Sequence, residues 1–316
     1  MSGAVHPFRF GLGPAGLLNL TTAGAWREFV RRAEDLGYEA VCLGDHIDDR
    51  PSPGHAAVAI AQWTNTLRAA IHVLNNDLRH PPVLARELCT IAMLSGGRFD
   101  AGLGAGWMLA DYDHAGLAFD APGQRIARLD EAAQIVRRAW SDETVSFSGE
   151  YFRAHEMTGR ALLGDAPRPR LVMGGGGPKM LAVAASHADI VSVNVRLDSG
   201  KLGPERGATA TIAKTRQKID VIREAAGARF ADLILQLEQH VVAVTDERDG
   251  ALARAAKTLD LPPDEAAASP HVLVGSVSEI VERLLGMRED FGFSYICMTA
   301  AAAESFAPVV ERLAGT

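Results

Sequence analysis

The chain has 316 residues, of which 47% are hydrophobic and 22% are charged, and this composition excludes a disordered or collagen-like protein. Its formal net charge of −7 and its pI of about 5.8 exclude the basic footprint of a nucleic-acid-binding protein. Its apolar stretches fall short of the ~20 residues of a membrane span, and the N-terminus lacks the apolar core of a signal peptide.

Eight apolar runs predict β-strands, because they show little polar alternation, as strands buried on both faces do. In chain order the expected strands are Phe8–Gly13, Ala40–His46, Leu67–Asn76, Arg98–Gly106, Arg170–Gly177, Asp189–Asn194, Leu233–Val244 and Ser294–Thr299.

Segments with apolar residues at helical spacing separate these runs. Thr22 is expected to cap the first helix, which Gly37 ends. The expected helices lie within residues 22–38, 55–65, 81–97, 124–140, 179–186, 208–226, 247–259, 277–290 and 303–313. Strands that alternate with helices in this way predict a (β/α)8 TIM barrel of the α/β class, in one domain over residues 1–316, in preference to an open doubly wound sheet.

Two connections are longer than ordinary loops, Trp107–Gly123 and Thr144–Arg168. Long ordered loops in compact domains are usually functional, so both are expected to be insertions at the active site. The three cysteines, Cys42, Cys89 and Cys297, are far apart and show no metal-ligand spacing. They indicate reduced thiols, no metal site and a cytoplasmic protein.

The stretch "GGRFDAGLGAGWM" resembles a dinucleotide-binding fingerprint at first sight. Its spacing is G-x-G-x-G, it follows the fourth strand, and no helix begins at once, so a Rossmann site is disfavoured. At the mouth of a barrel, glycines also let a flat ligand approach the backbone. We interpret Gly104 and Gly106 in this way, whereas Gly102 is expected to serve tight packing.

A second glycine run follows the fifth strand and comprises Gly174, Gly175, Gly176 and Gly177. Pro178 then opens a helix, so backbone N–H groups and the positive end of the helix are expected to bind a phosphate there. A tight turn, the alternative, needs only one or two glycines.

Polar residues end several strands. Asp45 and His46 follow the second strand, Asn75 the third and Asn194 the sixth, and Trp107 follows the glycines of the fourth. Histidine exchanges a proton near neutral pH, so His46 is the first candidate for proton transfer, with Asp45 beside it.

The seventh strand carries Gln236, Glu238 and His240 at alternate positions, which places them on one face of the strand. That face is expected to point into the barrel. Glu238 is a candidate catalytic acid, and a structural hydrogen-bond network is the alternative for all three.

Three motifs, "DH", "RHPPVLARELCTIAMLSGGRFDAGLGAGW" and "LVMGGGGPKMLAVAASHADIVSVN", resemble the bacterial luciferase-like superfamily. Within it the chain is most similar to deazaflavin (coenzyme F420)-dependent oxidoreductases. The resemblance implies a luciferase-like barrel with insertions at its C-terminal mouth, and a cofactor phosphate at Gly174–Gly177. It also implies a cis peptide between His72 and Val73 that backs the cofactor ring, with Asn75 at the pyrimidine edge of the ring. Trp107 departs from the sugar-phosphate dehydrogenases of the superfamily, which carry an acid in this region.

The resulting hypothesis is an F420-dependent oxidoreductase that moves a hydride between C5 of the deazaflavin and a small organic substrate. Reduction of an activated C=C or C=N bond is the expected direction, and oxidation of an alcohol is the reverse. One alternative is a two-component monooxygenase that uses flavin mononucleotide (FMN), and another is a barrel that binds a cofactor without turnover. The expected partners are the small-molecule substrate and a second copy of the chain, without nucleic acid or membrane.

Overall fold

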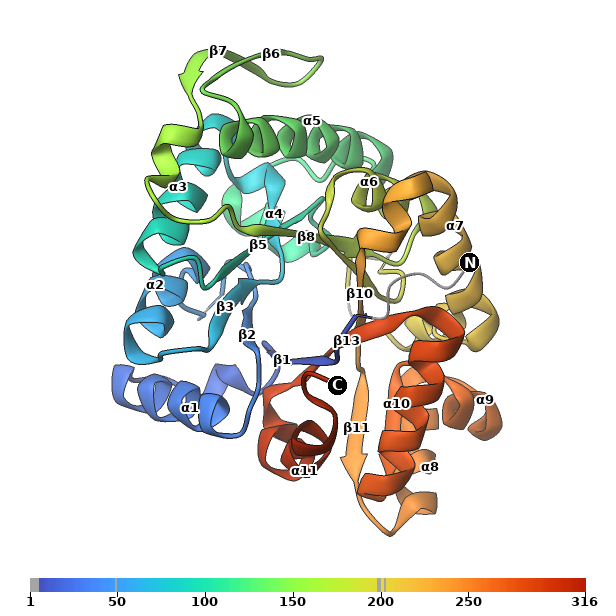
Figure 1. The fold of residues 1–316 in the computed structure, drawn as a ribbon. Helices are drawn as coiled ribbons and strands as arrows, with labels where there is room; N and C mark the ends of the chain where they lie inside the picture. The colour runs from blue at the N-terminus through green and yellow to red at the C-terminus, as the bar shows by residue number, and fades with distance from the viewer. Residues whose placement is uncertain (1–5, 49, 198–199, 202) are drawn as a thin grey trace.

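The computed structural model describes residues 6–48, 50–197, 200–201 and 203–316. Their strands form a parallel sheet that closes into a barrel, in the order β3-β2-β1-β13-β10-β9-β8-β5-β4, and a pairing between β3 and β5 completes the circle (Figure 1). The bounds are β1 Arg9–Gly13, β2 Ala40–Leu43, β3 Arg68–Ile71, β4 Leu74–Asn75, β5 Phe99–Gly104, β8 Arg170–Gly175, β9 Ile190–Val193, β10 Ile234–Glu238 and β13 Phe293–Thr299. The two-residue β4 continues β3, so the eight predicted barrel strands are confirmed.

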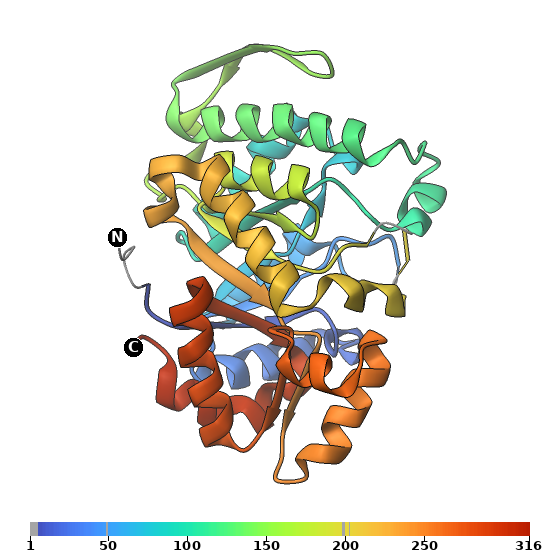
Figure 2. The ribbon, with the colours of Figure 1, turned by 90° about the vertical axis from the view of Figure 1, so that its right-hand side faces the viewer.

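Helices surround the barrel (Figures 1 and 2). They are α1 Ala23–Asp35, α2 Pro53–Trp63, α3 Pro81–Leu94, α4 Leu109–Ala115, α5 Pro122–Ser141, α6 Pro178–His187, α7 Ile212–Ala226, α8 Arg248–Leu259, α9 Pro263–Ala268, α10 Val277–Phe291 and α11 Ala303–Leu313. Short 3-10 helices are η1 Leu17–Asn19, η2 Asn76–Leu78, η3 Arg160–Leu163, η4 Pro204–Thr209, η5 Gly227–Asp232 and η6 Ala300–Ala302. As predicted, Thr22 caps α1, since its side chain accepts a hydrogen bond from Ala25 N, and the helix buries Trp26 and Val30 against the core.

The seventh predicted strand, Leu233–Val244, is in fact two strands. β10 ends at Glu238, and β11 (Val241–Val244) leaves the barrel to pair in parallel with β12 (Val272–Gly275). The break follows from hydrogen bonding: Gln239 N donates to Cys297 O of the barrel, whereas His240 N donates to His271 O beside β12. His240 therefore does not share the inner barrel face with Gln236 and Glu238, contrary to the prediction.

The two long connections lie at different places. Trp107–Gly123 follows β5 and carries α4 at the C-terminal mouth of the barrel, as expected. Thr144–Arg168 instead joins α5 to β8, and it holds the hairpin of β6 (Thr144–Ser148) and β7 (Arg153–Thr158), which projects beyond α5 (Figures 1 and 2). None of its residues lines the mouth pocket described below, so the prediction of a second active-site insertion is wrong. The physical reason is that a connection from a helix to a strand begins at the opposite end of the barrel from the strand-to-helix loops.

Buried ion pairs fill the barrel interior near the start of the strands. The carboxylate of Asp100 is fully buried and accepts hydrogen bonds from Arg68 and Arg170, at 2.7 and 2.6 Å for their closest N–O pairs. Arg170 also donates to Glu39, which pairs with Arg9. The remaining core lies between the strands and the helices. No helix in the described ranges is both long and apolar enough to cross a membrane.

Candidate active site

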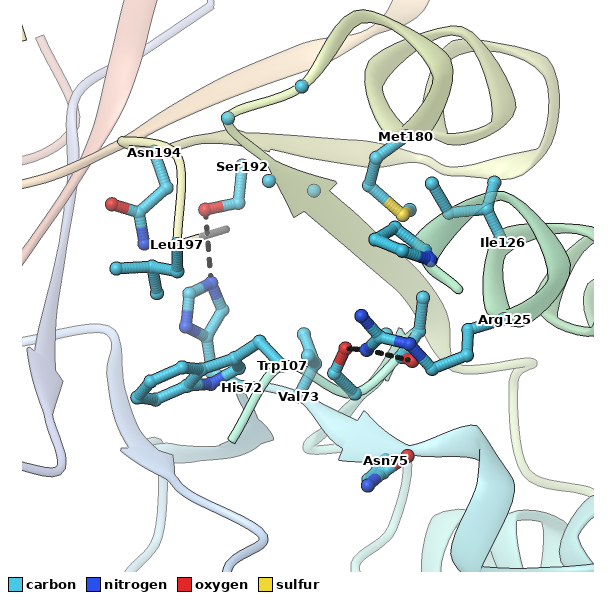
Figure 3. A pocket seen from close by; sticks show the side chains of 18 of the residues that line it. His72, Val73, Asn75, Trp107, Arg125, Ile126, Met180, Ser192, Asn194 and Leu197 are labelled. Carbon is cyan, nitrogen blue, oxygen red and sulfur yellow. Dashed lines mark hydrogen bonds between the residues drawn. The ribbon is translucent and has the colours of Figure 1, made fainter. Parts of the chain in front are cut away.

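The ends of the strands surround a pocket of about 250 Å³ at the barrel mouth (Figure 3). Every residue predicted for the site lines this pocket except Glu238. The structure therefore brings together side chains from five strand ends, which supports the predicted constellation. Sequence reasoning missed the following residues of the lining: Ala105, Asp111, Pro122, Arg125, Ile126, Met180, Ser192, Val195 and Leu197.

One wall of the pocket is a bulge between β3 and β4. The peptide bond between His72 and Val73 is cis, as the resemblance implied. The His72 ring is held by a 3.1 Å hydrogen bond between Nε2 and Ser192 Oγ (Figure 3). Ser192 lies on β9 across the barrel, so the bulge is fixed by tertiary contact.

Packing within the protein requires the glycines of β5 and of the loop that follows it. A side chain at Gly102 would overlap the carbonyl of Ile71, which confirms its packing role. However, a side chain at Gly104 would overlap Val73, and one at Gly106 would overlap the hydroxyl of Tyr112. Gly106 also has φ +71°, which favours glycine. The protein itself therefore requires glycine at both positions. Both residues also line the pocket, and their role in clearing space for a flat ligand stays a prediction.

Asn75 leaves one polar group unsatisfied. Its side chain is 4% exposed, and Oδ1 accepts a hydrogen bond from Asp77 N at 3.1 Å. Nδ2 is buried and has no partner among the described residues. A buried donor without a partner costs about 1–3 kcal/mol, so this amide is suited to donate to a bound ligand.

The glycine run after β8 contains one position that packing does not explain. Side chains at Gly174 and Gly176 would overlap the backbone of Ser192 and Val195, and one at Gly175 would approach Met180 Cγ to 2.9 Å. A side chain at Gly177 would meet nothing within 4 Å, and φ at Gly177 is −98°, which any residue adopts. Open space at this position gives a ligand close access to the backbone.

Gly177 is also the N-cap residue of α6, directly before its first residue, Pro178. No side chain caps this helix, and Pro178 occupies its first turn. The first N–H groups of a helix lack intrahelical partners and carry the positive end of its dipole, so this end of the pocket suits an anion. Lys179, which follows Pro178 in the same turn, does not line the pocket.

His46 and Asp45 have different partners. His46 Nδ1 lies 2.8 Å from Asp111 Oδ2, and Ile47 N donates to the other carboxylate oxygen at 3.0 Å. The edge of the His46 ring meets Trp107, with ring centroids 5.7 Å apart. Because Nδ1 is engaged by the carboxylate, Nε2 is the ring atom left for the pocket.

Asp45 is held in a structural ion pair. Its two oxygens accept hydrogen bonds from Arg79 at 2.6 and 2.9 Å, and one of them also accepts from Asn75 N. These bonds fix the start of η2 next to the bulge. The geometry therefore gives Asp45 a positioning role.

Glu238 lies behind the pocket, inside the barrel. Burial raises the pKa of its carboxyl to about 7, and Oε2 lies 4.0 Å from His72 Nδ1 without a hydrogen-bond partner. Asn194 does line the pocket, but its Oδ1 accepts from Val195 N at 2.7 Å and lies 2.9 Å from His240 Nε2. His240 thus acts on the site through Asn194.

The comparison with protein families decides the classification. The model of the family described as "luciferase-like monooxygenase" matches residues 3–295 of this chain. The chain belongs to this family. The luciferase-like resemblance drawn from the sequence is thereby confirmed, and so is the barrel fold.

Several proteins with related sequences carry names of F420-dependent enzymes or of a reductase. An F420-dependent glucose-6-phosphate dehydrogenase of Nakamurella multipartita is 29% identical over 279 residues, which cover 83% of this chain and 76% of that protein. Another, from Kineococcus radiotolerans, is 34% identical over 143 residues, so the match spans 43% of this chain but only 42% of that relative. A 5,10-methylenetetrahydromethanopterin reductase of Archaeoglobus fulgidus is 29% identical over 212 residues, or 63% of this chain and 61% of that one.

Solved structures share the fold at low identity. An F420-dependent secondary alcohol dehydrogenase in complex with an F420-acetone adduct has a TM-score of 0.71 at 17% identity, covering 97% of this chain and 98% of its own. The coenzyme F420-dependent tetrahydromethanopterin reductase of Methanopyrus kandleri has a TM-score of 0.72 at 16% identity, covering 98% and 99%. The names of the sequence relatives agree with the prediction of an oxidoreductase that uses coenzyme F420.

Proposed function

We propose that this luciferase-like protein is a coenzyme F420-dependent oxidoreductase. It passes a hydride between the deazaflavin C5 and a small organic substrate, in the direction that reduces an activated C=C or C=N bond. The observation that carries the proposal is that one pocket contains two groups left unsatisfied by the protein, Asn75 Nδ2 and the first turn of α6 at Gly177. The names of relatives that cover most of the chain support F420 over FMN.

The residues of the pocket fit such a cofactor. The first turn of α6 would bind a phosphate, the amide of Asn75 would donate to a ring carbonyl, and Val73 would lie against the ring. When bound, the deazaflavin supplies a two-electron carrier that accepts or releases a hydride. The protein contributes the orientation of the reactants and the proton.

His46 performs the proton transfer in this proposal. Hydride addition to an activated double bond leaves negative charge on the substrate, and a positioned acid must neutralise it. His46 lines the pocket, and its Nε2 is free for a substrate in this proposal because Asp111 holds Nδ1 at 2.8 Å. The carboxylate also stabilises the protonated ring while the substrate approaches. Asp45 keeps a positioning role in this arrangement, since Arg79 binds both of its oxygens.

A binding titration tests the cofactor. Coenzyme F420 should bind the purified protein at least about tenfold more tightly than FMN, which corresponds to ~1.4 kcal/mol. Equal or reversed affinities would exclude the deazaflavin assignment and favour the FMN-dependent monooxygenase. Tight F420 binding without turnover on any substrate class would instead favour the non-catalytic barrel.

We also propose that residues 1–316 form a single domain and that the protein is a homodimer. One continuous sheet runs from β1 to β13, which supports the single domain. A solution mass measurement checks the assembly, and it should give twice the chain mass of 33.6 kDa.

A further inference from the structure

A second cavity lies beside the mouth pocket, between the loops that follow β1 and β2. Its volume is about 370 Å³, and apolar side chains make up most of its wall. We call it the Trp26 cavity, after the largest of them. The residues used below are Leu17, Leu18, Leu20, Trp26, Leu43 and Arg50.

Hydrogen bonds fix the wall of the Trp26 cavity in place. Trp26 Nε1 donates to Leu20 O at 2.7 Å, and Leu17 N donates to Pro14 O at 3.0 Å. The loop is also tied to the end of β13, because Thr299 Oγ1 donates to Ala15 O at 2.7 Å. At the rim, Leu18 is 54% exposed. A built apolar hollow with an exposed leucine at its edge is suited to an apolar ligand.

The Trp26 cavity and the mouth pocket are lined by consecutive residues just after the end of β2. Gly44 lines the first, and the next residue, Asp45, lines the second. A side chain at Gly44 would contact Arg50 Nη1 at 3.0 Å, His46 Cδ2 at 3.5 Å and Pro14 Cβ at 3.6 Å. Gly44 is therefore the point where the wall of the cavity touches the proposed proton donor.

Charge limits what the two cavities accept. Among the described residues that line them, the lysine and arginine side chains are Arg50 and Arg125. Arg50 is neutralised by Asp48, at 2.6 Å between Nη2 and Oδ2. Arg125 donates to the carbonyls of Gly106 and Ala105. Arg50 is therefore already paired with a carboxylate in the Trp26 cavity, whereas Arg125 lines only the mouth pocket, where the proposed cofactor binds.

We propose that the Trp26 cavity binds the apolar part of an uncharged substrate, whose reactive carbon lies beside His46. The inference rests on the proposed function, because it places the substrate relative to that enzyme's proton donor. It assigns an uncharged, elongated apolar molecule as the substrate class, because the one arginine among the described residues that line the Trp26 cavity is already paired and leaves no cation there for a sugar phosphate. The ligand would enter over Leu18 and lie along Leu17 and Trp26.

A homologous series of ligands tests this inference without turnover. Alkan-2-ones from butan-2-one to nonan-2-one are titrated by ligand-observed NMR, with and without coenzyme F420. Each buried methylene contributes ~0.8 kcal/mol, so the dissociation constant should fall about threefold to fourfold per added methylene until the cavity is full. Hexanoate should bind at least about tenfold more weakly than hexan-2-one, because burying an unpaired carboxylate is costly. The ring ¹⁵N signals of His46 should shift on addition of each ketone.

Matched variants locate the binding site. In Leu18→Asp, the change in binding free energy per added methylene should fall to less than half, and the ¹⁵N shift of His46 on ketone addition should disappear. The substitution should have little effect on folding because the side chain is exposed. Leu94→Asp, at an apolar position on α3 that is 48% exposed and outside both cavities, should leave the series unchanged. Thr21→Trp, which adds bulk at the exposed rim, should weaken the longer ketones more than butan-2-one.

The possible results separate the two proposals. A flat ketone series, equal losses in Leu18→Asp and Leu94→Asp, or tighter binding of glucose 6-phosphate than of the ketones overturns the inference, even if F420 binds. A steep ketone series together with no binding of F420 supports the cavity assignment and rejects the proposed cofactor.

Discussion

At the scale of single residues, the proposed role of His46 in proton transfer depends more on the partners of its ring than on its position in the sequence. Asp111 is 3% exposed and binds both His46 Nδ1 and Ile47 N, so one carboxylate fixes the ring and the loop that carries it. The sequence placed an acid beside His46, at Asp45, but the structure commits that acid to Arg79. The pair proposed for proton transfer is thus formed across 65 residues of chain.

Substitution of this pair should separate chemistry from binding. His46→Ala should slow the chemical step by ~10²–10⁴-fold. This step is measured as the single-turnover oxidation of pre-bound reduced F420 by a substrate with an activated C=C or C=N bond. Cofactor affinity should be nearly unchanged. Asp111→Asn should slow it by at least about tenfold, because an amide presents N–H to Nδ1 and does not stabilise the protonated ring.

Asp113→Asn provides the matched control, since Asp113 lies exposed on the same helix, α4. Its single-turnover rate should equal that of the unmodified protein. An unchanged rate in His46→Ala would remove this residue from the mechanism and leave Glu238 as the next candidate.

At the scale of secondary structure, the junction of β8 and α6 shows how one motif serves two purposes. Gly174 and Gly176 are needed because the backbone of β9 and of the segment after it lies against them, whereas Gly177 faces open space at the start of the helix. The first two allow the barrel to close, and the last leaves room for a ligand.

This difference predicts the behaviour of glycine variants. Gly177→Val should weaken F420 binding by at least about tenfold while the melting temperature stays near that of the parent, because the position has a permitted φ and free space. Gly174→Val should impair folding, since its side chain would overlap Ser192. Calorimetric titration and thermal unfolding measure the two effects.

Gly286→Val on α10 is the control, because a side chain at Gly286 also meets nothing within 4 Å. It should leave cofactor affinity intact. If Gly177→Val binds F420 as tightly as this control does, the phosphate lies elsewhere.

At the scale of the whole molecule, the two ends of the barrel have different tasks. The mouth holds the pocket, with the unsatisfied amide of Asn75 and the first turn of α6. The other end holds the buried ion pairs of Asp100. Burial by itself raises the pKa of Asp100, but its hydrogen bonds and charge interactions with Arg170 and Arg68 outweigh this effect. The pKa therefore lies below its ordinary value.

The sign of this shift predicts how stability depends on pH. A carboxylate whose pKa is lowered by folding stabilises the protein fully above its unfolded pKa of about 3.9, and this contribution is lost as pH falls further. Asp100→Asn should lower the free energy of unfolding at pH 7 by about 3 kcal/mol, because two arginines lose a buried partner. Between pH 4 and pH 2.5 the free energy of unfolding should also fall less in the variant than in the parent. The difference between the two falls should not exceed about 3 kcal/mol.

Urea unfolding at each pH measures both effects. Asp264→Asn, at an exposed site on α9, should match the parent throughout. Equal acid sensitivity of Asp100→Asn and the parent would mean that other carboxylates govern acid unfolding.

The sequence by itself determined the order of strands and helices, the barrel class and most of the residues at its mouth. It did so because burial on both faces leaves continuous apolar runs, and because parallel strands end at one edge. Only the tertiary structure decided which side chains become partners. It paired His46 with Asp111, ended β10 at Glu238, carried Thr144–Arg168 away from the mouth and distinguished Gly177 from its three neighbours. Each of these outcomes depends on contacts between residues far apart in the chain. Such contacts form only when the barrel closes, so the local pattern of side chains does not predict them.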